Sequence, residues 1–119
     1  MTKLHRVFAM AAVLLAVALG AATAQEGGAV TAANVAQRIE SAKTAADHQA
    51  LAAYFSSQAA AAAEKVKEHE GMLTALKQTR TASVMAPHCN ALIKSSKEAQ
   101  KDYQKLAQEE ENLAKQAGK

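Results

Sequence analysis

The 119-residue sequence has little of several residue types that stabilise small domains. It contains no tryptophan, two tyrosines, two phenylalanines, one proline and one cysteine. A single cysteine cannot form a disulfide within the chain, so it is buried and inert, paired with a second chain, or used as a ligand or reactive thiol. The scarcity of large side chains limits the apolar surface that one copy buries, which favours pairing with a second copy.

The chain also lacks a cluster of like charge. Two of its 14 basic residues, Lys3 and Arg6, precede the first apolar run, which leaves 12 basic side chains against 11 acidic ones in the remainder. These charges alternate in sign along the predicted helices. Because nucleic-acid affinity depends on clustered positive charge, we expect no nucleic-acid partner.

No long apolar run follows the N-terminal one. Lys3 and Arg6 are followed by apolar residues 7–19 and by the small residues Ala22 and Ala24, the pattern of a cleaved secretory signal over residues 1–24. The apolar run is too short to cross a bilayer. We therefore expect a periplasmic or secreted chain that begins at Gln25 and has no stable membrane insertion after signal cleavage.

The rest of the chain is predicted to form one helical domain. Residues 25–30 contain glycines and polar side chains and are predicted to be a disordered linker before a domain at 31–119. Val35 and Ile39 lie four residues apart, which indicates a short helix from residue 31 to near 43. Thr44 and Asp47 match a capping box, so a second helix should begin there.

Two long apolar seams follow, each with a period close to 3.5 residues. The second helix is predicted to end between residues 78 and 83, and the third to begin near 83–86, with Pro87 in its first turn and Gly118 at its end. The predicted seam of the second helix is His48, Leu51, Phe55, Ala59, Ala62, Val66, His69, Leu73 and Leu76. The predicted seam of the third helix is Met85, Cys89, Leu92, Ser96, Ala99, Tyr103, Leu106, Glu110 and Leu113.

These seams predict an all-α fold. A short N-terminal helix precedes a long antiparallel two-helix hairpin with coiled-coil packing, in which the numbers of opposing residues sum to about 162. Because such a hairpin with few large side chains buries little surface, we expect two copies to pair as a homodimer and form a four-helix bundle.

Soft donor atoms gather near the predicted turn of the hairpin. The set consists of His69, Met72, Met85, His88 and Cys89. Spacings of three and four residues put donors on one face within each helix. Imidazole, thioether and thiolate together point to a soft metal, copper(I) first and zinc second. The competing interpretation is that the histidine and methionines are ordinary core residues.

Other chemistry finds little support in the sequence. His48 lies 21 residues from His69, about 31 Å along a helix, so it cannot join that cluster within one hairpin. The sequence has no glycine-rich phosphate loop, HExxH motif, nucleophile elbow or CxxCH haem attachment site. We therefore expect no enzymatic activity. The two functions that remain are periplasmic copper(I) binding and a non-catalytic structural or interaction module of the cell envelope.

Four segments resemble a set of small, exported, alanine-rich helical proteins of bacteria. They are Asp47-His48 with Tyr54, His69-Glu-Gly-Met72, Met85-Ala-Pro-His88-Cys89, and Tyr103 with Leu106-Ala107. The resemblance covers about residues 35 to 115 and implies the helical-hairpin fold, with no activity attached. Pro87 departs from that pattern, which has alanine at this position.

Overall fold

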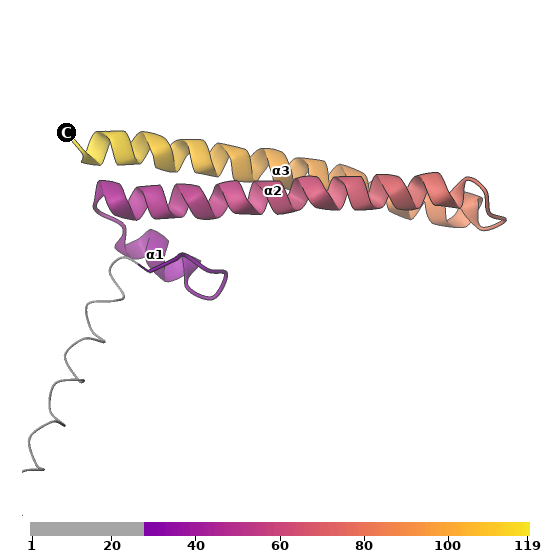
Figure 1. Ribbon diagram of the computed structural model, residues 1–119, viewed down its shortest axis with the longest axis horizontal. Helices are drawn as coiled ribbons and strands as arrows, with labels where there is room; N and C mark the ends of the chain where they lie inside the picture. Colours follow the sequence, from indigo (N-terminus) through magenta and orange to yellow (C-terminus); the bar gives the residue numbers. More distant parts are fainter. Residues whose placement is uncertain (1–27) are drawn as a thin grey trace, which may run out of the picture.

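The computed structural model describes residues 28–119 and consists there of three helices without strands. They are α1 (Val35–Ser41), α2 (Ala45–Leu76) and α3 (Ala82–Ala117). Figure 1 shows α2 and α3 side by side, joined by a short loop at what we call the loop end. The C-terminus and α1 lie at the opposite, open end. The all-α hairpin prediction is confirmed, whereas the predicted signal, 1–24, and linker residues 25–27 lie outside the described residues.

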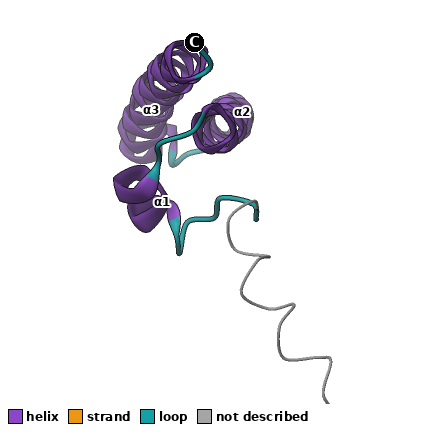
Figure 2. Cartoon of the chain, turned by 90° about the vertical axis from the view of Figure 1, so that its left-hand side faces the viewer, coloured by secondary structure: helices purple, strands orange, loops and turns teal. Residues whose placement is uncertain are grey.

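Helix α1 turns the chain onto the side of the hairpin. Figure 2 views the molecule from the open end and shows α1 below the paired long helices. The side chain of Asn34 accepts a 2.8 Å hydrogen bond from the backbone of Thr31, ahead of the first turn. Val30 and Val35 pack against the core cluster formed by α2 and α3. The side of the hairpin that α1 contacts is called the α1 flank below.

The capping box at the start of α2 is confirmed. The Thr44 hydroxyl accepts from the backbone N–H of Asp47 at 3.1 Å, and the Asp47 carboxylate accepts from the backbone N–H of Thr44 at 2.9 Å. The same carboxylate accepts from the backbone N–H of Lys43 at 3.0 Å. Three N–H groups that the helix itself cannot satisfy therefore have partners.

The predicted seam of α2 agrees closely with the observed burial. Leu51, Phe55, Ala59 and Val66 are buried, and the remaining predicted seam residues are at least half-buried. Ala52 is buried as well. A regular heptad spacing of inward residues therefore runs along the whole of α2, as in a coiled coil.

The predicted seam of α3 is right in one column and wrong in the other. Its inward residues form two columns of seven-residue spacing, and the predicted members Cys89, Ser96, Tyr103 and Glu110 make up most of the first. The second column contains Ala86, Ile93, Gln100, Ala107 and Ala114, each one position after a predicted seam residue, although the predicted Ala99 is half-buried as well. Met85, Leu92, Leu106 and Leu113 are each 40 to 45 % exposed.

Large residues on α2 explain this choice. Ala107 packs in one cluster with Leu51 and Phe55, which already fill the space between the helices. A leucine facing them would overpack the contact, so small side chains turn inward on α3. Tyr103 also covers Phe55, with ring centroids 6.4 Å apart.

Two contacts fix the register of the hairpin. The His48 and Glu110 side chains meet at 2.7 Å, and the Phe55 ring stacks on that of Tyr103. The residue numbers of both pairs, 48 with 110 and 55 with 103, sum to 158, four below the expected sum near 162. Continued by heptads toward the loop end, this register sets Ala62 opposite Ser96 and His69 opposite Cys89.

The sequence predicted Pro87 in the first turn of α3. In the structure Pro87 is the sixth residue of this helix and therefore lies beyond the first turn. The helix begins earlier because the Thr81 carbonyl accepts from the backbone N–H groups of Val84 and Met85 at 3.1 and 3.0 Å. Pro87 has no N–H to donate to the carbonyl of Ser83. Ser83 is exposed, so water can satisfy that carbonyl.

Replacing the most buried core side chain tests this packing. Leu51 is 1 % exposed, and we expect Leu51→Ala to lower the free energy of unfolding by about 2–5 kcal/mol because it leaves a cavity. Val84→Ala is the matched control, since Val84 is 68 % exposed and its truncation should change stability by less than about 0.5 kcal/mol. Denaturant unfolding followed by circular dichroism measures both; equal losses would contradict the described core.

The cap predicts an acid-sensitive helix start. Hydrogen bonds from the backbone N–H groups of Lys43 and Thr44 lower the pKa of Asp47 from 3.8 to about 2. The cap therefore stabilises the fold fully above the unfolded pKa near 3.8, and this contribution is lost as the pH falls toward 2. A carboxyl titration by NMR should give the low pKa. Thermal unfolding should depend less on pH between these limits in Asp47→Asn; an unchanged pH dependence would contradict the prediction.

Candidate metal centre

Two of the five predicted donors lie inside the hairpin. Cys89 is 3 % exposed and His69 is half-buried, both on the inward columns of their helices. The observed register, in which opposing residue numbers sum to 158, sets them opposite each other in one layer. The predicted sum near 162 would have offset them by about four residues. Nδ1 of His69 is buried and has no hydrogen-bond partner. This layer therefore combines a free thiol with an unsatisfied imidazole nitrogen.

An unsatisfied nitrogen in this position is unusual. Most buried polar side-chain atoms in folded proteins have a hydrogen-bond partner, and leaving one without costs about 1–3 kcal/mol. His69 also occupies a seam position where a leucine would pack without this cost. A bound group that accepts the nitrogen lone pair would remove the penalty, and a soft metal ion is one such group.

The other three donors lie outside the seam. Met72 is 42 % exposed and Met85 is 44 % exposed, and His88 is exposed as well. By heptad position all three lie on the α1 flank, toward the loop end. Met72 follows His69 by three residues and Met85 precedes Cys89 by four, so each methionine neighbours the interior layer on its own helix.

The cluster is thus divided between an interior pair and an exposed edge. Within residues 28–119, no three histidine, cysteine, aspartate or glutamate side chains gather as a group that could hold a metal. A centre built from this set would need methionine sulfur in addition to His69 and Cys89. The flexible thioether side chain of methionine suits such a role, because it has three rotatable bonds.

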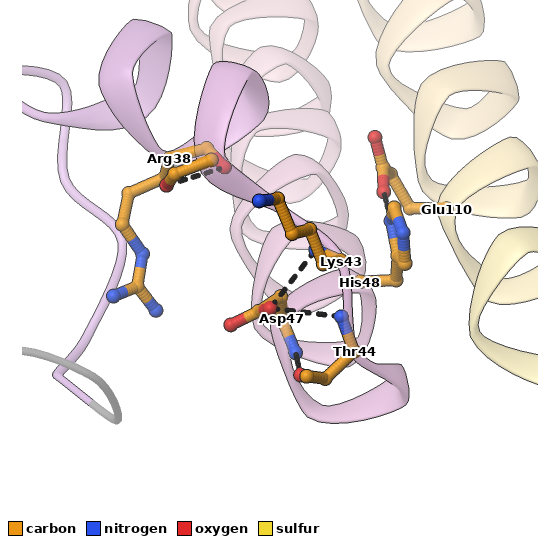
Figure 3. A network of polar contacts seen from close by, with 7 residues as sticks. Arg38, Lys43, Thr44, Asp47, His48 and Glu110 are labelled. Atoms are coloured by element: carbon orange, nitrogen blue, oxygen red, sulfur yellow. Dashed lines mark hydrogen bonds and ion pairs between the residues drawn. The ribbon is translucent and has the colours of Figure 1, made fainter. Parts of the chain in front are cut away.

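His48 belongs to a separate polar contact at the open end. Its Nδ1 lies 2.7 Å from Oε2 of Glu110, and the two side chains are only 15 % and 13 % exposed. Figure 3 shows this pair beside the capping network of Lys43, Thr44 and Asp47. The predicted sum near 162 placed His48 beside Leu113 and so did not identify Glu110 as its partner. The pair fixes the hairpin register, far from the cluster at the loop end.

The flank opposite α1 has a different character. Lys97 and Glu70 form an exposed ion pair of 3.4 Å between α3 and α2 there, which contributes little stability. A shallow groove of about 510 Å³ on the same flank is lined by small and polar side chains. The lining residues include Ser56, Ala60, Ala63, Gln104, Gln108 and Glu111. The residues named on this surface include no histidine, cysteine or methionine and no large apolar side chain.

Comparisons with family models, curated proteins and solved structures gave no match to the chain. In the part of the chain from residue 28 onward, none of the helices has the length and apolar content needed to cross a membrane.

Burial of Cys89 predicts a protected thiol. An aromatic disulfide reagent should react with the native protein at least about tenfold more slowly than with the unfolded chain, because the seam must open first. The control is Cys89→Ser combined with Asn90→Cys, which moves the thiol to the neighbouring exposed position. Stopped-flow absorbance measures both rates; equal native rates at positions 89 and 90 would contradict the burial.

Proposed function

We propose that the protein binds copper(I) in the periplasm, through His69 and Cys89 in the interior of the hairpin and Met72, Met85 and His88 on its edge. The observation that carries the proposal is the layer shared by a buried free thiol and a buried imidazole nitrogen without a partner. Zinc is the second choice of metal.

The donor chemistry supports copper(I) over harder ions. Thiolate and thioether ligands select copper(I), and no carboxylate is part of the set. Both acidic neighbours of His69 in sequence are already paired, Glu68 with Lys65 at 2.7 Å and Glu70 with Lys97 at 3.4 Å. Magnesium and calcium prefer oxygen ligands, which this set does not supply.

Binding would change the protonation state of the thiol. Cysteine binds metal as the thiolate, so the metal would take the place of the thiol proton of Cys89. His69 would contribute its neutral imidazole through the nitrogen that now has no partner. Opening of the loop end would give the ion access, because Met85 and Met72 are exposed there and the seam residues are not.

An interaction module of the cell envelope is the second candidate, without catalytic activity. Four large apolar residues on α3, Met85, Leu92, Leu106 and Leu113, are exposed to an extent that is unusual for a regular series. They support the expectation that two hairpins associate into a four-helix bundle. Met85 belongs both to the proposed donor set and to these exposed residues, whereas Leu92, Leu106 and Leu113 are not metal donors.

A competition experiment tests the metal proposal. The purified protein is titrated with copper(I) under reducing conditions against a chromogenic chelator. We expect one copper(I) per chain, with an affinity at least about tenfold lower in Cys89→Ser and in His69→Ala, and a smaller loss in Met72→Leu and Met85→Leu. His48→Gln is the control histidine variant and should bind as tightly as the original chain.

Two results would refute the metal proposal. One is copper(I) binding by the original chain that is no tighter than binding by a variant carrying both Cys89→Ser and His69→Ala. The other is an equal loss of affinity in His48→Gln, which would indicate that any histidine contributes alike. Circular dichroism of each variant shows whether the hairpin remains folded, so loss of binding is not confused with unfolding.

A further inference from the structure

The exposed apolar residues of α3 form a single straight column. Met85, Leu92, Ala99, Leu106 and Leu113 are spaced by seven residues, and we call them the α3 stripe. The column immediately precedes the inward column of Ala107 and Ala114, so it lies on the α1 flank. Residues one position after the other inward column, such as Gln104, line the groove on the opposite flank.

The α3 stripe is exposed at its four large residues, whereas Ala99 at its centre is half-buried. The stripe spans 28 residues, which corresponds to about 42 Å of helix. Helix α1 packs at the open end of this flank, yet Leu106 and Leu113 stay 44 % and 40 % exposed there. Ala99, at the centre of the stripe, is the only small residue in it. The stripe is therefore a continuous apolar column whose smallest side chain is in the middle.

We propose that the α3 stripe is the contact between two copies of this chain, with the two α3 helices antiparallel and Ala99 on the two-fold axis. This proposal rests on the pairing suggested under the proposed function, and its central contacts at Leu92, Ala99 and Leu106 use no proposed metal donor. A two-fold axis at Ala99 brings Leu92 against Leu106 of the partner, and Met85 against Leu113 of the partner. Each contact occurs twice, as a two-fold interface requires.

The arrangement of sizes supports this axis. The side chains at 7 and 14 residues on either side of Ala99 are all large and apolar, so the stripe matches its own reverse. The alanine allows the two helix backbones to approach at the crossing point, and the larger residues fill the space on both sides.

The size of the contact indicates its strength. A helix face about 42 Å long and about 10 Å wide buries about 420 Å² on each copy, or about 840 Å² in total, which is below the roughly 1,200 Å² of stable specific complexes and within the range of weak, transient ones. Exposed Met72 on the same flank adds to it. We therefore expect a dissociation constant in the micromolar range, so that the chain is a dimer at high concentration and a monomer when dilute.

Sedimentation with metal removed by a chelator tests the proposal. From about 1 μM to about 1 mM protein, the original chain should shift from monomer to dimer. Leu92→Glu and Leu106→Glu should each weaken association at least about tenfold without loss of helicity, because both residues are exposed in the single hairpin. Ala60→Glu, at an exposed position on the opposite flank, is the control and should associate like the original chain.

A charge-swap variant tests the direction of the helices. In the antiparallel pair, Leu92→Glu combined with Leu106→Lys sets glutamate against lysine twice and should recover at least about tenfold in affinity over either single charged variant. In a parallel pair the same variant would set like charges together and recover nothing. A chain that stays monomeric throughout, an equal effect of Ala60→Glu, or no recovery in the charge-swap variant would overturn the proposal. Because metal is absent, these results do not depend on whether copper binds.

Discussion

Alanine side chains make up much of the contact between α2 and α3, and the other features of the hairpin depend on this contact. Ala59 and Ala107 are buried in it, together with a few large residues of which Leu51 is the most enclosed. Small side chains set how the helices meet and leave little apolar area to stabilise them. The contact therefore determines which residues of α3 turn inward and which remain exposed.

The same contact determines what the donor residues can do. His69 and Cys89 share a layer because the register is set far away, at the open end, by the pairs of His48 with Glu110 and Phe55 with Tyr103. A coiled-coil register is rigid over many heptads, so a contact at one end fixes which residues meet at the other. The polar pair at the open end thus controls the alignment of a distant layer.

A core with so few large side chains has a further consequence for α3. Because Leu51 and Phe55 already occupy the space opposite Ala107, the neighbouring Leu106 has no room inside and is exposed on the α1 flank. A single hairpin thereby carries both a packed seam and a second apolar surface. The composition of the seam and the exposed stripe have one physical origin, which is the limited volume between two closely packed helices.

The sequence by itself determined the helical class, the capping box at Thr44, the seam of α2 and the buried column of α3 that contains Cys89. These follow from local hydrogen bonding and from heptad periodicity, which one chain segment carries alone. Periodicity could not decide between Leu106 and Ala107 for the second column, because adjacent columns have the same period and only the facing helix selects between them. The partner of His48 and the alignment of His69 with Cys89 were likewise decided by tertiary structure, since register is a property of two helices packed together.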